Sequence, residues 1–408
     1  MSGTVATGSE RSNDIEPVPP ALSHAALFWR FLRFGMLAFG GPVAQIAMIR
    51  RELVEEEQWL SGARFNRLLA VMQVLPGPEA HELCVHLGIR AKGRVGGFLA
   101  GLGFMLPGLI LMLCLGWAYT RLPFQAGMLG AVFLGVQAAV IAVVFRAVHR
   151  IGEHILLDPW LWTIAAFGAA ATLIGASFWL VLLAGGAVYV LAGRRNYGTA
   201  GLIATGAVAA SILLGEFRSA GVPTTVVQSS EASILLLFWA GLKGGMLTFG
   251  GAYTAIPFIR NDTVGRGWMT DAQFLDGLGL AGILPAPLVI FATFAGWIAG
   301  GLAGALAITA GMFLPAFAFS LLFYERLEAV VENERLQRFL AGVAAAVVGL
   351  IGVTLLNLAR AALERSPSPL ISAAVFALGL IILYRWKSKF SPLATLCVGA
   401  VVGGLLLT

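Results

Sequence analysis

Charged residues are scarce in this sequence. Asp, Glu, Lys and Arg make up 12% of its 408 residues, whereas a soluble domain usually carries about 25%. Hydrophobic residues make up 58%. A soluble chain of this length has no room to bury so many apolar side chains, because its own surface needs polar cover. The scarcity of charge therefore excludes an ordinary soluble protein.

Cysteine is also scarce, and a signal peptide is lacking. Cys84, Cys114 and Cys397 lie in separate apolar runs, which excludes a disulfide framework and a CxxC pair, so we interpret them as small apolar residues. Residues 1–20 are polar and contain three prolines, without the basic and apolar regions of a cleaved signal peptide. We expect this tail to be disordered.

Long apolar runs are plentiful. They recur from Ala25 almost to the C-terminus, and we count about 13 segments of membrane-crossing length, seven before Glu216 and six after it. Glycine is abundant too, with 51 residues, many inside apolar runs, where small residues let membrane helices pack closely. The composition therefore predicts an all-α polytopic membrane protein. The net charge of +6 does not indicate nucleic-acid binding, because the basic residues are dispersed between the runs and orient helices there.

The two halves of the chain repeat each other. FWRFLRFGMLAFGGPVAQIAMIR at 28–50 and FWAGLKGGMLTFGGAYTAIPFIR at 238–260 agree at about half of their positions. Further on, LPGP at 75–78 parallels LPAP at 284–287. Internal repeats are typical of secondary transporters. We expect one transporter repeat over 21–198, an inverting transmembrane segment and linker over 199–230, and a second transporter repeat over 231–408.

The charge pattern predicts that the two repeats have opposite topologies. IRAKGR at 89–94 is basic, whereas its counterpart AGWIAGG at 295–301 carries no charge. In the second half the basic residues lie in the alternate turns, for example in YRWKSKF at 384–390. The positive-inside rule then predicts an N-terminus in the cytoplasm and a C-terminus in the periplasm.

Each repeat has two predicted helix breaks, a double glycine and a pair of prolines. A broken helix exposes backbone groups to lipid at a cost of several kcal/mol each, so it persists only beside protein or a watery cavity. A single break is often a tolerated kink, but matched breaks in both repeats indicate a substrate site, and half-helix N-termini favour anions. The residues predicted to bind substrate at the breaks are Phe39, Gly40, Gly41, Pro76, Gly77, Pro78, Phe249, Gly250, Gly251, Pro285 and Pro287.

Basic residues accompany the breaks symmetrically. Arg33 and Lys243 occupy equivalent positions inside apolar runs, and Arg50 and Arg260 close both runs. An ionised residue in a membrane segment is costly and indicates function. The alternative for Arg50 and Arg260 is that their long side chains reach the headgroups. We predict that these four residues offset the charge of a small dianion. The charged run that follows Arg50 is interpreted as solvated surface with paired ends.

Acidic and imidazole groups follow only the first proline pair. Glu79, Glu82 and His86 share one helical face, and with His81 they are predicted to carry protons for coupling. The alternative for Glu79 is capping of the helix after Pro78. The two histidines of HELCVH are five residues apart, about 140° around a helix, so they do not match the i, i+4 pair of a zinc site. No metal or other cofactor is expected.

At these motifs the chain resembles the chromate ion transporters of bacteria, a family whose long members consist of two homologous halves of opposite topology. The motifs that carry the resemblance are FGGP at 39–42, IR at 49–50, WL at 59–60, LPGP at 75–78, GRVGG…LPG at 93–108 and FGG at 249–251. The resemblance covers nearly the whole chain. It implies efflux of chromate across the inner membrane, driven by the proton gradient. The chain departs from the family at Glu79, His81 and Glu82, where many members carry hydroxyl or amide residues, and in LPAP.

The predicted function is therefore chromate export by a secondary transporter whose halves rock against each other. One alternative keeps the carrier and changes the cargo to sulfate or another oxyanion. A membrane-embedded enzyme using the Glu79–His86 cluster would lack a nucleophile–base pair, so no enzyme is expected. A channel would need a ring of filter ligands, which nothing here suggests. The expected partners are the oxyanion, protons and the bilayer. A homodimer remains open.

Overall fold

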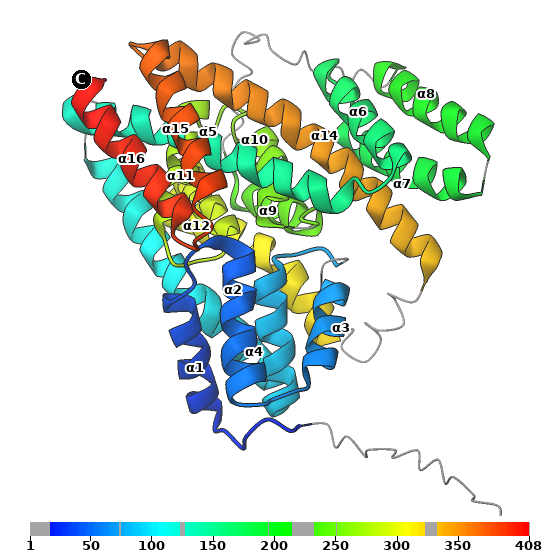
Figure 1. The fold of residues 1–408 in the computed structure, drawn as a ribbon, viewed down its shortest axis with the longest axis vertical. Coiled ribbons are helices and arrows are strands. Elements are labelled where there is room, and N and C mark those ends of the chain that lie inside the picture. Colours follow the sequence, from blue (N-terminus) through cyan, green and yellow to red (C-terminus); the bar gives the residue numbers. More distant parts are fainter. Residues whose placement is uncertain are drawn as a thin grey trace, which may run out of the picture.

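The protein is built from helices, as predicted. The computed structural model describes residues 17–72, 75–122, 127–194, 196–213, 232–249, 251–322 and 333–407. Within these ranges every regular element is helical (Figure 1). The tail predicted to be disordered lies mostly outside the described residues, as does most of the linker after Leu213.

Within the described part of the chain, ten helices have the apolar character of membrane segments. Four of them are long enough to cross a bilayer: α4 (Glu79–Arg121), α5 (Gly127–Ile155), α12 (Phe291–Leu322) and α14 (Glu334–Arg365). Six are shorter: α6 (Pro159–Leu173), α7 (Phe178–Gly193), α8 (Tyr197–Leu213), α9 (Ile234–Met246), α15 (Pro369–Arg385) and α16 (Ser391–Leu406). Large apolar side chains such as Leu235 and Leu370 lie exposed, as expected where a surface faces lipid. The chain is a multi-pass membrane protein.

Short elements precede each long helix pair. In the first half they are α1 (His24–Met36), α2 (Gly41–Arg50), η1 (Arg51–Glu56) and α3 (Gly62–Met72). In the second half α9 is followed by η2 (Ala252–Ala255), α10 (Ile256–Thr263), α11 (Asp271–Ile283) and η3 (Leu288–Ile290). At 1.5 Å per residue none of them exceeds about 20 Å, and the hydrocarbon core is about 30 Å thick. Each element alone is therefore too short to cross the membrane.

The helices α4 and α12 each fold back on themselves at equivalent glycines. Gly93 and Gly301 have φ of +66° and +61°, and the residue before each has φ of −148°. Gly88 then packs against Gly96, and Gly296 against Gly304. Each helix is therefore a hairpin with a short first arm. The proline breaks lie beside the long arm of the other hairpin, since a Cβ on Gly77 would meet Ala316 and a Cβ on Gly108 would meet Ala286.

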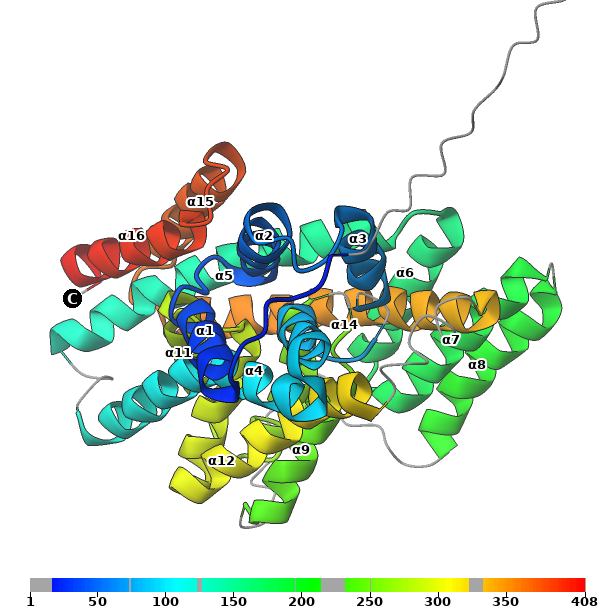
Figure 2. The same ribbon diagram turned by 90° about the horizontal axis from the view of Figure 1, so that it is seen from below.

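The two repeats are intertwined. In each half the first helix packs along its own hairpin, α1 on α4 and α9 on α12. The long helix that follows instead packs against the last two helices of the other half: α5 contacts α15 and α16, and α14 contacts α6 and α7. Figure 2 shows the result, with α15 and α16 at one end of the molecule and α6 to α8 at the other.

Glycine makes these crossings close, as the sequence predicts for membrane helices. A Cβ on Gly135 would collide with the backbone of Gly399, and a Cβ on Gly342 would collide with that of Gly185. The helices therefore approach through small residues on both sides.

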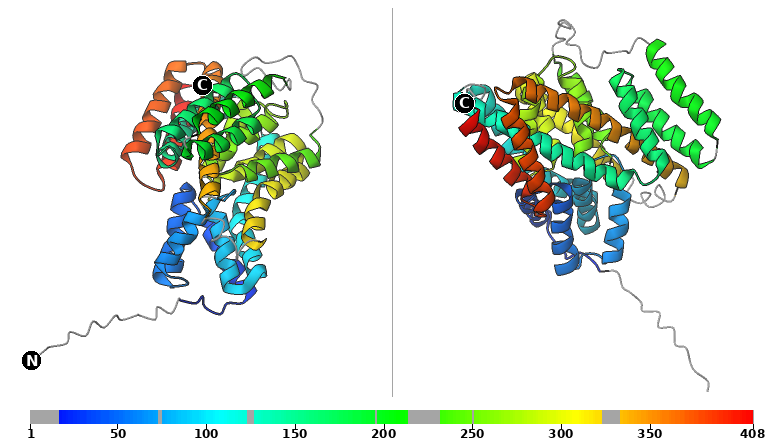
Figure 3. Two further views of the ribbon diagram at one scale, coloured as in Figure 1. Left: turned by 90° about the vertical axis from the view of Figure 1, so that its right-hand side faces the viewer. Right: turned by 45° about the horizontal axis from the view of Figure 1, so that its top comes forward.

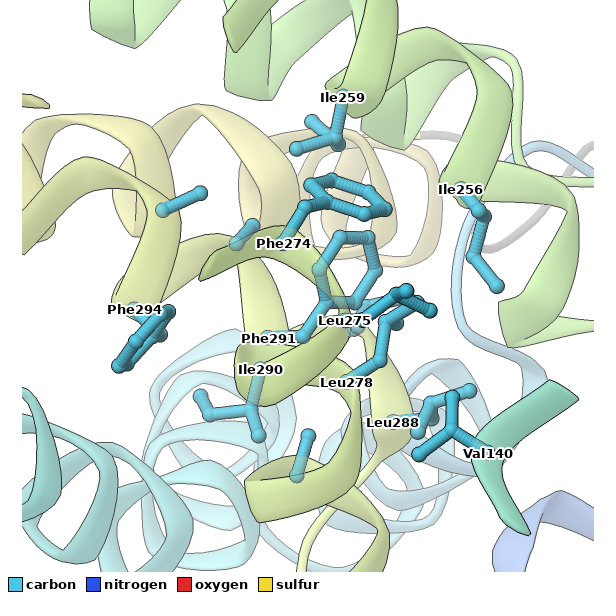
Figure 4. Packing of buried hydrophobic residues seen from close by; sticks show 14 of the residues in the cluster. Val140, Ile256, Ile259, Phe274, Leu275, Leu278, Leu288, Ile290, Phe291 and Phe294 are labelled. Carbon is cyan, nitrogen blue, oxygen red and sulfur yellow. The ribbon is translucent and has the colours of Figure 1, made fainter. Parts of the chain in front are cut away.

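The largest apolar core joins both repeats. It includes Val140 from the first repeat and Phe274, Phe291 and Phe294 from the second (Figure 4). Phe274 and Phe291 meet edge to face at 5.5 Å, an arrangement that favours aromatic packing. Helices α1 to α3, in blue, lie in the lower part of the molecule, apart from the green helices α6 to α8 (Figure 3). The core holds the two repeats in one body, and the helix breaks lie beside it.

Candidate functional site

The predicted glycine breaks are real interruptions of the helices. In the first half α1 ends at Met36 and α2 begins at Gly41, with φ of +91° at Gly40 and +78° at Gly41. In the second half Gly251 has φ of +134° before η2. These are left-handed or otherwise glycine-specific conformations. Gly250 lies outside the described residues.

The predicted proline breaks also interrupt the helices. Gly77 has φ of +144° between Pro76 and Pro78. Pro78 and Pro287 are each the N-cap of the helix that follows. Proline fits there because the cap residue has extended backbone angles, which its ring permits. Pro285 precedes Pro287 in the loop between α11 and η3.

The breaks are crossed between the two halves. The amide of Gly77 donates to the carbonyl of Thr248, beside the glycine break of the second half, at 2.9 Å. In the opposite direction, Gln45 on α2 donates through Nε2 to the carbonyl of Ala286, between Pro285 and Pro287, at 3.1 Å. The proline break of each half is thus bonded to the glycine-break region of the other.

A small cavity lies at one of these crossings. Its volume is about 50 Å³, several times the roughly 10–15 Å³ that one water needs on the same kind of measure. The lining includes Phe39, Gly40 and Gly41 from the first glycine break, Leu284, Ala286 and Leu288 from the second proline break, Tyr253 from η2, and Lys389 from the turn between α15 and α16. Predicted substrate residues from one half therefore meet the other half around a small cavity.

Lys389 also lines a larger, open cleft. The cleft has a volume of about 450 Å³ and is bounded by α2, by η1 and by Lys389, with Arg51, Glu52 and Glu56 among its side chains. Within the described part of the chain, no acidic group lies in ion-pair contact with Lys389. Lys389 therefore lines both the open cleft and the small cavity.

The second glycine break differs from the first in how its backbone is satisfied. The amide of Phe249 donates to Oγ1 of Thr254 at 3.1 Å, and that hydroxyl donates to the carbonyl of Gly251 at 2.7 Å. Phe249 itself is buried. At the second break Thr254 therefore satisfies backbone groups on both sides of the glycines. The residues of the first break instead line the cavity.

The predicted cations Arg33 and Lys243 each have an acidic partner. Arg33 pairs with Glu52 and is half-exposed. Lys243 pairs with Asp262 and is buried, with the ring of Phe178 lying 4.8 Å from its ammonium. The structure places neither residue on the cavity lining.

Arg50 and Arg260 are paired as well. Arg260 makes two hydrogen bonds to Asp271, from Nε at 2.6 Å and from a terminal nitrogen at 2.8 Å. Arg50 lies 3.3 Å from Glu55 and 3.5 Å from the side-chain oxygen of Asn66. The planar guanidinium of Arg260 thus fits its carboxylate in the bidentate manner typical of arginine.

The predicted proton-coupling residues are all buried. Glu79, His81, Glu82 and His86 lie on the short first arm of the α4 hairpin. The His81 ring packs against Phe313 and Phe317 of α12, with centroids at 5.0 and 4.7 Å. The Glu82 carboxyl lies so close to Gly77 that a Cβ there would collide with it. Neither carboxyl oxygen has a hydrogen-bond partner among the residues described.

Metal binding finds no support in the described ranges. No group of three or more His, Cys, Asp or Glu side chains gathers there in a way that could hold an ion. The described histidines of the HELCVH sequence instead sit in the buried arm of α4.

Sequence reasoning missed three contributors to the site. Gln45 is polar and buried, but a lone glutamine in an apolar run gave no pattern to follow. Lys389 was assigned only to the basic turn that orients the last helices. Asp262 could have been found, because it occupies the position equivalent to Glu52 in the repeat alignment.

Comparison with known proteins places the chain in one family. The sequence model of the family described as "Chromate transporter" matches residues 25–190 and again 235–404. The same family therefore accounts for both repeats.

Several similar proteins span nearly the whole chain. A Pseudomonas aeruginosa protein named "Chromate transport protein" is 61% identical over 96% of this chain and 94% of its own length. A "Probable chromate transport protein" of Synechococcus elongatus is 32% identical, covering 97% and 98%. A "Chromate transport protein" of Cupriavidus metallidurans is 32% identical, covering 95% and 94%. These names describe transport and not catalysis. No solved structure gives a significant match.

With a family match over both repeats and full-length relatives at this level of identity, the chain belongs to the chromate transporter family.

Proposed function

We propose that this chain exports chromate across the bacterial inner membrane by alternating access of two inverted repeats, coupled to the proton gradient. The observation that carries the proposal is the crossing of the helix breaks, in which Gly77 bonds to Thr248 and Gln45 bonds to Ala286. Broken helices at a repeat interface are where secondary transporters bind substrate. The cargo is supported by the 61% identical relative that is named for chromate transport.

The cavity beside the first glycine break is the proposed anion site. Its volume of about 50 Å³ is of the order needed for a tetrahedral oxyanion, given about 10–15 Å³ for one water. Gly40 and Gly41 let the backbone approach the ligand closely, because they carry no side chain. The start of α2 adds the positive end of a helix dipole.

The positive charge at this site comes first from Lys389. The four cations predicted from sequence already face Glu52, Asp262, Glu55 and Asp271, so their charge is largely offset. They set the field around the site, whereas Lys389 lines the cavity directly. An ammonium group is a compact point charge that suits an oxyanion of any orientation.

Glu82 is the proposed coupling group of the first repeat. A charged carboxylate without partners costs several kcal/mol to bury, and its oxygens have none among the described residues. A proton would therefore leave Glu82 only when water or a cation reaches it. Glu82 lies against Gly77, so movement of the proline break would change its access to water. Glu79, His81 and His86 line the same arm and would pass the proton on.

The second candidate cargo is sulfate, because it has the same charge and tetrahedral shape as chromate. The cavity offers mainly apolar walls and one lysine, which recognise charge and size and do not distinguish the central atom. Competition between the two anions measures how far the carrier discriminates between them.

The test is flux of radiolabelled chromate in proteoliposomes that contain the purified chain, with and without an imposed pH gradient and with excess sulfate. We expect saturable flux that the gradient accelerates, and a loss of that acceleration in Glu82→Gln. The matched control is Glu364→Gln, which changes an exposed carboxylate paired with Arg360. Folded protein that moves neither anion under any gradient would contradict the proposal. Saturable flux that ignores the gradient would leave transport and remove the coupling.

A further inference from the structure

Another buried carboxyl, that of Asp276, lies at a contact between the two repeats. Asp276 is on α11 of the second repeat and is 2% exposed. One carboxyl oxygen accepts a hydrogen bond from the hydroxyl of Tyr119 on α4, at 2.7 Å. The other accepts from Nε2 of Gln137 on α5, also at 2.7 Å. Both donors belong to the first repeat.

The surroundings of this cluster are apolar. The ring of Tyr119 stacks edge to face on Phe294 and Phe133, with centroids at 5.0 and 6.1 Å. Gln137 and Tyr119 are buried with Asp276. A buried polar cluster of this kind is stable only when its members satisfy one another.

One buried polar atom of the cluster lacks a hydrogen-bond partner among the described residues. The side-chain oxygen of Gln137 is buried and makes no hydrogen bond to any residue that the structure describes. A buried carbonyl without a partner is destabilising, because it has lost its hydrogen bonds to water. The charged carboxylate of Asp276 needs donors and has two, so it has no use for this oxygen.

The unused oxygen fits the protonated form of Asp276. A neutral carboxylic acid must donate one hydrogen bond. If the Gln137 amide turns over, its oxygen replaces its NH₂ group beside the carboxyl and accepts that bond, while Tyr119 continues to donate to the other oxygen. The same three side chains can therefore hold either protonation state, with the Gln137 NH₂ group in place of its oxygen on the far side when Asp276 is protonated.

We propose that Asp276, Tyr119 and Gln137 form a second proton-binding site of the transporter, between the two repeats. Its use in transport rests on the proposed function, whereas proton binding itself does not. Because the site joins α11 of one repeat to α4 and α5 of the other, any relative movement of the repeats would strain or break it. Protonation and movement would thereby be linked.

The charges that face the site are few. The helices α12 and α16 and the turn η3, which pack on α11, carry no charged residue. The charged residue nearest to Tyr119 along α4 is Arg121, and the one nearest to Gln137 along α5 is Arg146. The C-terminal part of α14 carries Arg360, Glu364 and Arg365. Tyr119 is the titratable group in direct contact.

The first test is infrared difference spectroscopy of the purified protein in lipid, recorded as the pH is lowered. We expect a carbonyl band of a newly protonated carboxyl that is absent in Asp276→Asn and shifted in Tyr119→Phe and Gln137→Leu. The matched control, Glu364→Gln, should keep that band. Asparagine has the shape of the protonated acid and keeps partners in the cluster, so the variant is expected to fold. A spectrum unchanged by Asp276→Asn overturns the proposal.

The second test asks whether transport uses the site. In proteoliposomes, Asp276→Asn should exchange chromate between equal pools at a rate within about twofold of that of the unmodified chain. Its rate of gradient-driven uptake should be about tenfold lower. An equal loss of exchange and of gradient-driven uptake in folded protein would show that Asp276 has only a structural role, and would contradict the role in coupling. If the unmodified chain shows the infrared band but no gradient-driven flux, the proposed coupling fails while the proton site stands.

Discussion

The same ion pair occurs twice in this molecule, in two different environments. Arg33 pairs with Glu52 in the first repeat and Lys243 with Asp262 in the second, and the two pairs are equivalent in the repeat alignment. The side chains of Arg33 and Glu52 are 53% and 18% exposed. Those of Lys243 and Asp262 are 8% and 4% exposed. Both repeats therefore have a cation paired with a carboxylate at this position, but the pair is exposed in the first repeat and buried in the second.

The difference arises from what covers each pair. Phe178, at the start of α7, lies over the Lys243 ammonium. In the first repeat Glu52 instead borders the open cleft that Lys389 also lines. The same two charges are therefore sealed in one half and reached by solvent in the other. Their energetic weight follows from this, because burial removes the water that screens an ion pair.

The largest expected effect is the loss of one partner of the buried pair. Asp262→Ala leaves Lys243 buried without its carboxylate, which should lower the free energy of unfolding by about 3–5 kcal/mol. Thermal unfolding of the purified protein in detergent measures it. The double variant Lys243→Ala, Asp262→Ala is the control and should recover part of the loss. A single variant no less stable than Glu52→Ala would refute the contrast between the two pairs.

Substitution of the glycine at each hairpin turn by alanine should lower the free energy of unfolding equally in the two halves. Gly93 and Gly301 have nearly the same positive φ, and a Cβ at either position would meet open space. Alanine there should cost about 1–3 kcal/mol of stability in each half from backbone strain alone, because positive φ with ψ near 180° is open essentially only to glycine.

Gly198→Ala is the matched control for these two variants. It also lies in open space but in the helix α8, so alanine should stabilise it by about 0.5–1 kcal/mol. A large difference between Gly93→Ala and Gly301→Ala would show that the two hairpins are not equivalent.

The smallest effect is expected at the exposed pair. Glu52→Ala should change the free energy of unfolding by no more than about 1 kcal/mol, because solvent already screens the interaction. The change should shrink further when the unfolding is measured at high salt. A loss as large as that of Asp262→Ala would mean that the first pair is buried in the folded protein in the membrane.

The sequence predicted what depends on local pattern. The helix breaks at Gly40 and Gly77 followed from glycine and proline chemistry. The capping box of Thr270 and Gln273 has the spacing that a local rule recognises, and the structure contains it. Close helix packing through glycine was also expected and is seen at Gly135 and Gly342.

What depends on contacts between the halves was not predictable. The charged run after Arg50 was interpreted as solvated surface, and Glu55 and Glu56 are indeed exposed, but Glu52 turns inward to Arg33. The bond from Gln45 to Ala286 joins residues far apart in sequence, and no local rule specifies it. Lys389 meets the first glycine break only because α15 and α16 pack on the other repeat's α5.

The most direct test of the central claim is equilibrium binding of radiolabelled chromate to the purified protein. The claim is that the crossed breaks and Lys389 form the anion site. Lys389→Ala should weaken binding about tenfold, or about 1.4 kcal/mol, whereas Lys387→Ala, which changes a lysine in the same turn outside the cavity lining, should bind as tightly as the unmodified chain. Equal affinity in all three proteins, or equal weakening by both substitutions, would contradict the account.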